Sequence, residues 1–156
     1  MIEFEVPGLR KFQLKNLVLD YNGTIAFDGE LIPGVEKLLS ELSKQLKIYI
    51  VTADTFNKVK DFQNLIEAEV HILPPEDQIK LKADFVEILG QDSTVVIGNG
   101  ANDSKMLKVS ALGIAVIGKE GASSKTLQNA DIVCNSIEDA LNLLLNPKLI
   151  IATLRQ

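Results

Sequence analysis

Short apolar runs alternate along this chain with segments of helical spacing, and this alternation limits the fold more than any other feature. Runs rich in Val, Ile and Leu have the length of buried strands at NLVLD, LKIYIVTA, EVHIL, TVVIG, GIAVIG and ADIVC. They are too continuous for strands with one face in water. Strands buried on both faces, with a helix between successive strands, form a parallel sheet covered by helices on both sides. The pattern therefore predicts an α/β fold with three layers.

Apolar residues at helical spacing occupy the segments between these runs. After Pro33, which suits the first position of a helix, one helical face gathers Val35, Leu38, Leu39 and Leu42. Further stripes are Phe56, Val59 and Phe62, then Ile79, Phe85, Ile88 and Leu89, and finally IEDALNLLL after the candidate N-cap Ser136. Each stripe predicts a helix that covers one face of the sheet.

Nothing between successive strands is long enough for a second domain, so we expect residues 1–156 to form one domain. The segment AFDGELI, between the strand NLVLD and the helix after Pro33, contains Asp28-Gly29, a dipeptide typical of tight hairpins. It predicts a small flap over the carboxyl edge of the sheet. No cap domain is expected.

The composition limits the partners. With 46% hydrophobic residues, 24% charged residues and a formal net charge of −5, the chain is typical of a globular protein and poorly suited to nucleic acid or an anionic membrane surface. The stretch ALNLLLNPKLIIATL is interrupted by Pro147 and Lys148 and falls short of a membrane span. One cysteine, Cys134, and the start MIEFEVPG, which lacks the character of a signal peptide, predict a cytoplasmic protein.

Polar residues follow the strands where a parallel sheet binds its ligands, at the carboxyl edge. Asp20 ends the run NLVLD, and Gly23 allows a sharp turn whose main-chain N–H groups can point at an anion. A carboxylate placed there can attack phosphorus and form an aspartyl phosphate. Alone, Asp20 and Gly23 would equally be ordinary turn residues.

Three further elements meet the same edge. Thr52 can give a hydroxyl to a phosphoryl oxygen or simply cap a helix, and Asn102 and Asp103 follow the glycines of GNGAND, where a loop and a first-turn charge are the plain alternative. Phosphoryl transfer also needs a fixed positive charge, for which Lys80 and Lys82 are candidates. Each signal is weak alone. Their occurrence in one order along alternating strands favours a phosphoryl-transfer site.

In this combination the residues resemble the haloacid dehalogenase-like phosphatases and phosphotransferases, and most closely the phosphorylation domain of P-type cation ATPases. LVLDYNGTIA is similar to the first motif, Asp-X-X-Gly-Thr, with Asp20 as nucleophile and Thr24 at the end. VTAD is similar to the ATPases' Thr-Gly-Asp and places Thr52 and Ala53 in the second motif. VVIGNGANDSKML resembles their Gly-Asp-Gly-X-Asn-Asp signature. In the proline-led LPPEDQIKLKADFVEIL, the spacing to the following apolar residues fits Lys82 better than Lys80 as the third-motif lysine.

The resemblance implies a cap-less, Rossmann-like domain that uses Mg²⁺ and an aspartyl phosphate on Asp20. It implies that the catalytic residues beside Asp20 are Asn22, Thr52 and Lys82, and that the substrate is bound by Gly23, Thr24, Ala53 and Asn102. Of these, Thr52, Lys82 and Asn102 would hold the transferring oxygens. It also implies a metal shell drawn from Asp20, the Asn22 main-chain carbonyl, Asn99 and Asp103. The expected substrate is a phosphorylated small molecule or macromolecule.

The chain departs from the family's pattern at Asn22, Asn99 and Tyr21. At the position of Asn22, phosphatases of the family carry an aspartate that acts as general acid and base. P-type ATPases, like this chain, lack an aspartate there. An amide cannot transfer protons, so hydrolysis should be slowed by about 10² to 10⁴. Asn99 replaces the aspartate that binds magnesium, which predicts weaker binding of a hard cation. Tyr21 stands where the ATPases have a lysine.

Two functions fit these departures. The first is a magnesium-dependent phosphatase or phosphotransferase, whose open site requires a large substrate or a neighbouring subunit as cover. The apolar tail LNPKLIIATLRQ is a candidate contact for such a homo-oligomer, although packing on its own sheet is the plainer use of its side chains. The second is a phosphate-sensing or regulatory domain in which Asn22 and Asn99 have weakened the chemistry. A receiver-like domain is disfavoured because no acidic pair precedes Asp20 at the end of an earlier core strand.

Overall fold

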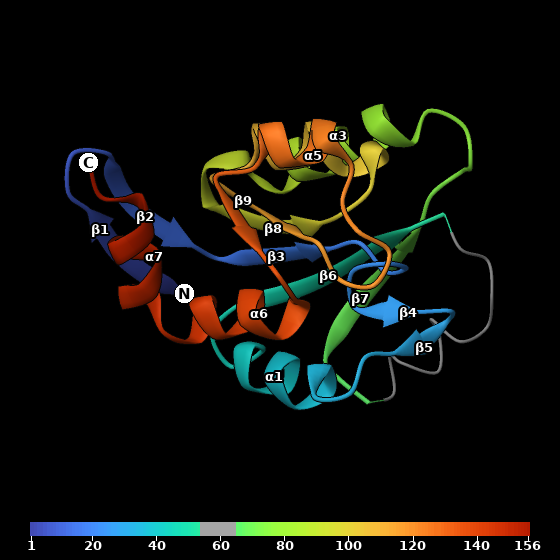
Figure 1. The fold of residues 1–156 in the computed structure, drawn as a ribbon, viewed down its shortest axis with the longest axis horizontal. Coiled ribbons are helices and arrows are strands. Elements are labelled where there is room, and N and C mark those ends of the chain that lie inside the picture. The colour runs from blue at the N-terminus through green and yellow to red at the C-terminus, as the bar shows by residue number, and fades with distance from the viewer. Residues whose placement is uncertain (54–64) are drawn as a thin grey trace.

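A six-stranded, wholly parallel sheet forms the centre of the molecule, which the computed structural model describes over residues 1–53 and 65–156. The strand order is β10-β9-β8-β3-β6-β7 (Figure 1). The strands are β3 (Asn16–Leu19), β6 (Lys47–Thr52), β7 (Ala68–Ile72), β8 (Thr94–Gly98), β9 (Leu112–Val116) and β10 (Ile132–Cys134). These are the strands predicted from the apolar runs. The central strand β3 lies between β6 and β8, so the residues after these three strands meet at one edge.

Helices cover both faces of this sheet, as predicted. One face carries α3 (Gln78–Leu89), α4 (Ser104–Val109) and α5 (Ser124–Asn129), and the other carries α1 (Val35–Leu42) and α6 (Ile137–Leu145) (Figure 1). Short 3₁₀ turns precede β8 and α4, at η1 (Gln91–Ser93) and η2 (Ala101–Asp103). Alternate residues of β3 face the two layers: Leu17 and Leu19 pack in one apolar cluster, and Val18 packs in the other. A strand buried on both faces explains why the run has no polar alternation.

The flap and the last predicted helix form as expected. Strands β4 (Ala26–Phe27) and β5 (Glu30–Leu31) pair antiparallel around Asp28 and Gly29, both of which have positive φ. This is the backbone that a two-residue hairpin turn requires. At the start of α6, the Ser136 hydroxyl accepts a hydrogen bond from the Asp139 N–H at 3.1 Å.

The stripe predicted for α3 is wrong at two positions. The buried face of the helix consists of Lys82, Ala83 and Val86, whereas Ile79 is 37% exposed and Ile88 is 84% exposed. Ile88 lies two residues after Val86, about 200° around the helix, and therefore points to solvent. The predicted stripe of Phe56, Val59 and Phe62 lies outside the described residues. Within the described ranges, no helix combines the length and the apolar character needed to cross a bilayer.

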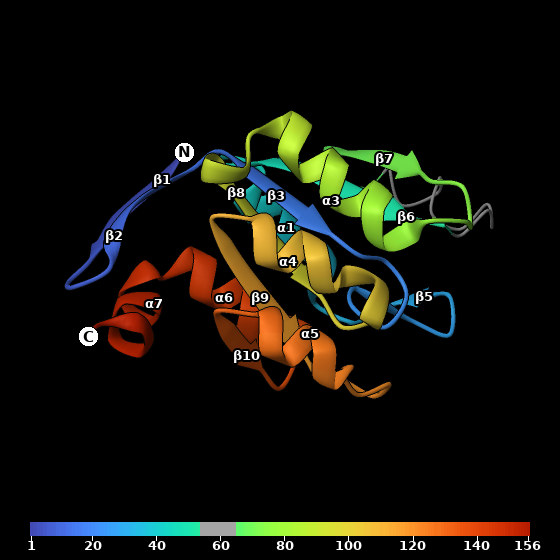
Figure 2. The same cartoon turned by 90° about the horizontal axis from the view of Figure 1, so that it is seen from above.

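The two ends of the described chain add a feature that the sequence analysis did not predict. Strands β1 (Ile2–Val6) and β2 (Arg10–Leu14) form an antiparallel hairpin, and α7 (Pro147–Leu154) packs against β1 (Figure 2). The rings of Phe4 and Phe12 stack with centroids 4.9 Å apart, and Ile150 of α7 is fully buried. The apolar tail therefore has a use within the chain, in packing on the N-terminal hairpin.

Replacing Ile150 by alanine should lower the free energy of unfolding by about 2–4 kcal/mol, because it leaves a cavity between α7 and the hairpin. Ile88→Ala is the matched control, since that side chain is already in water and its removal should cost less than about 0.5 kcal/mol. Urea unfolding of both variants measures the difference. Equal losses would contradict the packing described for α7.

Candidate active site

The predicted constellation lies together at the carboxyl edge of β3, β6 and β8. Asp20 follows β3, Thr52 ends β6, and the loop from Asn99 to Asp103 follows β8. Asp20, Thr52 and Asp103 are all buried, at 7%, 4% and 0% exposure. Neighbouring parallel strands end at the same height, so residues far apart in the sequence are brought to one place by the sheet alone.

Lys82 occupies the centre of this cluster. Its ammonium nitrogen lies 2.7 Å from Asp20 Oδ1 and 2.7 Å from Asp103 Oδ1, and the residue is only 1% exposed. It is carried there by the buried face of α3, which packs against the loop after β8. Lys80 lies on the exposed side of the same helix and pairs with Asp84. The geometry thus selects Lys82 as the lysine that contacts the nucleophile position.

Asp103 fixes the loop after β8. Its Oδ2 accepts hydrogen bonds from the main-chain N–H groups of Asn99 and Gly100, each at 3.0 Å, while its Oδ1 binds Lys82. A Cβ on Gly98 would lie 2.6 Å from Asp103 Oδ2, so the close approach requires glycine there. Both carboxylate oxygens therefore have partners within the protein. The expected role of Asp103 in a metal shell stays a prediction.

Asn99 joins the turn after Asp20 to a second loop. Its Oδ1 lies 3.3 Å from the Thr24 hydroxyl, which is also 3.4 Å from Asp20 Oδ2. Its Nδ2 donates to the Gly121 carbonyl at 3.2 Å. A hydroxyl has one proton, so Thr24 can donate to only one of these two acceptors at a time. The amide thus connects Asp20, through Thr24, with the loop from Gly118 to Gly121.

The turn after Asp20 differs in one respect from expectation. Gly23 has a φ of 79°, as a sharp turn requires, but its N–H donates to the Ala26 carbonyl at 2.7 Å. The Thr24 N–H similarly approaches the Tyr21 carbonyl at 3.2 Å. These two N–H groups close the turn itself and do not point at an anion in this structure. Their predicted part in binding phosphate would fall instead to the Thr24 hydroxyl and to the backbone beside Asp20.

Tyr21 has a role that the sequence analysis missed. It is 2% exposed and belongs to the apolar cluster below the sheet, and its hydroxyl lies 3.4 Å from the Gly29 carbonyl at the flap turn. A lysine could not occupy this apolar position without losing its hydration. Where the ATPases have a charge beside the site, this chain therefore has a tyrosine packed under the flap. The periodic pattern of apolar residues did not predict that Tyr21 is part of the core.

The remaining predicted residues lie at the same edge. Asn22 forms a bridge with Ala26 at the base of the flap, and Ala53 directly follows β6. Asn102 lies in η2, half-buried, with its Oδ1 close to Gly100. The structure brings all the predicted site residues to one edge.

The charges in this cluster do not balance, because one lysine faces two carboxylates. The pKa of Asp20 is raised to about 7, first by burial and then by the charge of Asp103, while Lys82 partly opposes both effects. Burial would lower the pKa of Lys82, but the two carboxylates outweigh this effect and hold its pKa above the usual value. The site therefore carries surplus negative charge in a place with little water. A bound cation would remove that surplus.

The donors at this edge fit Mg²⁺. The Asp20 carboxylate, the Asn22 carbonyl and the Asn99 amide oxygen are hard oxygen atoms, which this cation prefers. Because Gly23 has no Cβ, the Asn99 amide can lie close against this turn; a Cβ there would lie only 2.9 Å from Asn99 Oδ1. In the described part of the chain, no three His, Cys, Asp or Glu side chains cluster closely enough to hold a metal by themselves. Amide, carbonyl and phosphate oxygens would therefore complete the shell.

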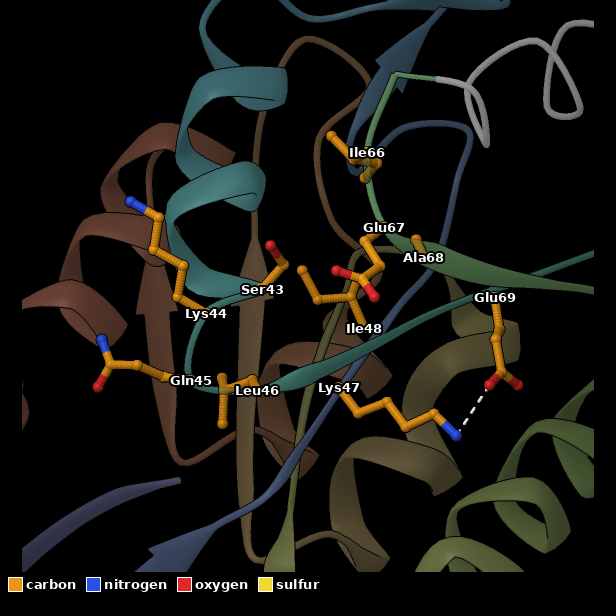
Figure 3. A pocket seen from close by; sticks show the side chains of 10 residues that line it. All are labelled: Ser43, Lys44, Gln45, Leu46, Lys47, Ile48, Ile66, Glu67, Ala68 and Glu69. Atoms are coloured by element: carbon orange, nitrogen blue, oxygen red, sulfur yellow. Dashed lines mark ion pairs between the residues drawn. The ribbon is translucent and has the colours of Figure 1, made fainter.

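A separate hollow lies at the opposite edge of the sheet. It has a volume of about 680 Å³ and is bordered by the segment before β6 and the start of β7 (Figure 3). Both lysines of its lining are already paired: Lys47 binds Glu69 at 2.8 Å, and Lys44 binds Glu41 at 2.6 Å. Those contacts leave it without the anion-binding chemistry found around Asp20.

Sequence comparisons show similarity to hydrolases and to a phosphatase. The family model of haloacid dehalogenase-like hydrolases matches residues 83–141. A soluble P-type ATPase-like phosphatase of Methanocaldococcus jannaschii is 24% identical over 123 residues, which are 77% of this chain and 45% of that protein. An uncharacterized protein of the same organism is 56% identical over 61 residues, 39% of this chain and 66% of its own length. The chain thus spans less than two thirds of these relatives.

Solved structures share the fold. The 3-deoxy-D-manno-octulosonate 8-phosphate phosphatase of Moraxella catarrhalis, in complex with magnesium, phosphate and a sugar acid, superposes with a TM-score of 0.66 at 18% identity, covering 91% of this chain and 94% of that one. The catalytic domain of a CPx-type ATPase superposes with a TM-score of 0.58 at 27% identity, covering 75% of this chain and 46% of that one. At 18% identity the first match shows the fold alone.

Replacing Asp20 by asparagine tests the charge imbalance. Because the pKa of Asp20 rises from 3.8 to about 7 on folding, the folded protein binds more protons than the unfolded chain between these values. The protonated Asp20 carboxyl therefore adds to the free energy of unfolding below pH 3.8, and this contribution is lost as the pH rises through about 7. Between about pH 5 and pH 8, in EDTA, the melting temperature of the wild type should therefore fall relative to that of Asp20→Asn. A constant difference would contradict the shift.

Proposed function

We propose that the chain is a haloacid dehalogenase-like hydrolase, acting as a magnesium-dependent phosphatase or phosphotransferase that forms an aspartyl phosphate on Asp20. The observation that carries the proposal is the buried contact of Lys82 with both Asp20 and Asp103. A lysine and two carboxylates out of water are costly for a purely structural purpose. They are useful where a phosphoryl group with several negative oxygens must be held.

In the proposed reaction, an Asp20 carboxylate oxygen forms a bond to phosphorus while the bond from phosphorus to the leaving oxygen breaks. The leaving oxygen takes up a proton and departs as an alcohol. Water, or a second acceptor, then attacks the phosphorus and releases Asp20. Lys82 and Thr52 would stabilise the transferring oxygens from α3 and the end of β6, with Asn102 contributing from η2. Bound Mg²⁺ would neutralise charge between phosphate and carboxylate.

Asn22 sets the expected fate of the phosphorylated protein. Its position is the one from which a carboxylate would give a proton to the leaving group and later take one from water, and an amide can do neither. The phosphorylated state should therefore persist. This observation favours a second candidate function, a phosphate-sensing or regulatory domain in which the phosphorylated form is the signal.

The surroundings of the site favour a substrate that brings its own cover. Only residues 73–77 separate β7 from α3, and the flap β4–β5 is a minimal hairpin, so neither place holds a cap. Beside the flap lies a hollow of about 480 Å³ with Phe27, Leu31 and Ile137 among its apolar walls, bordered by Gly23 and Thr24. We propose that it takes part of a phosphorylated substrate or of a neighbouring subunit.

Turnover of a chromogenic phosphate ester in the presence of Mg²⁺ tests the enzyme hypothesis. Asp20→Asn should lower the rate by about 10³-fold or more, because the nucleophile is lost. Lys80→Ala is the matched control and should retain the rate, since that lysine is exposed and pairs only with Asp84 on its own helix. An active Asp20→Asn variant would place the nucleophile elsewhere. Absence of turnover, with a hydroxylamine-sensitive phosphoryl label on Asp20, would favour the regulatory domain.

Asn22→Asp restores a group that can transfer protons. We expect it to shorten the lifetime of the phosphorylated protein by about 10²-fold. The decay of a radioactive phosphoryl label after removal of the donor measures this lifetime. Asn142→Asp, which adds the same charge on the exposed side of α6, should leave it unchanged. Equal lifetimes in all three proteins would show that Asn22 does not limit hydrolysis.

A further inference from the structure

The loop from Gly118 to Gly121 lies directly against the turn that follows Asp20. A Cβ on Gly23 would lie 2.3 Å from Glu120 Oε2 and 2.6 Å from Asn99 Nδ2, so Glu120 and Asn99 approach the same face of this glycine. The hollow beside the flap includes Gly23, Glu120 and Gly118 in its lining. A carboxylate thus lies next to the amide that replaces the family's metal-binding aspartate.

Several contacts hold this loop in place. The Gly121 carbonyl accepts from Asn99 Nδ2 at 3.2 Å, and the Ser123 N–H donates to the Asn99 carbonyl at 2.8 Å. The Lys119 ammonium lies 5.1 Å from the centre of the Phe27 ring on the flap. The position of Glu120 is therefore set by bonds on both sides of it.

Glu120 has no cationic partner among the residues that the structure describes. The ion pairs of the described chain do not include it, and the adjacent Lys119 is directed to the Phe27 ring. A carboxylate held against a polar turn without a counter-charge is suited to a cation from solution.

We propose that Glu120 supplies the carboxylate charge that Asn99 lacks at the cation site, an inference that rests on the proposed magnesium-dependent function. The substitution at position 99 then does two things. It removes a negative charge next to the cation, and it provides an N–H donor, which an aspartate does not have, for the Gly121 carbonyl. That hydrogen bond holds the loop that brings Glu120 back to the site. The charge is retained but comes from a different strand end.

Binding of Mg²⁺, measured by calorimetry, and of Mn²⁺, measured by electron paramagnetic resonance, tests this inference without turnover. Glu120→Gln should lower the affinity for both cations by about 10-fold, which is the effect typical of groups that support a metal's ligands. Glu138→Gln is the matched control, because Glu138 is an exposed glutamate of the same hollow and should not change the affinity. Melting temperatures in EDTA verify that both variants are folded.

The double variant Asn99→Asp/Glu120→Gln returns the charge to position 99. It should recover most of the affinity lost in Glu120→Gln, which a merely structural role of Glu120 would not allow. Unchanged affinity in Glu120→Gln, with normal binding and turnover by the wild type, would overturn the inference and leave the proposed function intact. A wild type that binds neither cation and has no turnover would overturn both.

Discussion

The contact of one buried ammonium with two carboxylates is the interaction on which the site depends. Lys82 reaches Asp20 and Asp103 only because β3 and β8 are adjacent and α3 packs against the loop after β8. Removing one partner from such a buried set typically costs about 3–5 kcal/mol, since an unpaired charge remains out of water. The three groups must therefore stay together once they are buried, although burying them is itself costly. Their surplus negative charge has a purpose if a cation and a phosphoryl group complete the set.

Tyr21 and Asn99, two of the positions where the sequence departs from the family's motifs, both lie near this contact. The Tyr21 side chain, directly after Asp20, lies in the core beneath the flap. Asn99 gives up a charge and gains a donor, and with it a hydrogen bond to the loop after β9. In both cases the altered residue supports an element beside the site, the flap in one and the Glu120 loop in the other. The Moraxella catarrhalis phosphatase shares this fold at 18% identity.

The flap and the Gly118–Gly121 loop also define what is near the site. The Lys119 ammonium of the loop lies over the Phe27 ring of the flap, and Gly23 lies near both the loop and Asp20. The loop, the flap and the nucleophile turn thus form one connected wall. We expect a substitution in any of the three segments to shift the other two, because their contacts are short and leave no room for an added methyl group at Gly23.

The sequence by itself determined the parallel sheet, its covering helices, the flap turn and the edge where Asp20, Thr52 and Asp103 meet. Continuous apolar runs and tight-turn dipeptides are local signals, and the carboxyl edge follows from topology. The motif spacing already favoured Lys82 over Lys80, and the structure places Lys82 against Asp20. Only the tertiary structure decided that Ile88 faces solvent and that Tyr21 belongs to the core. It alone paired the N-terminal hairpin with α7 and placed Glu120 beside Asn99. These features depend on helix rotation and on contacts between residues distant in the chain, for which a sequence pattern carries no local signal.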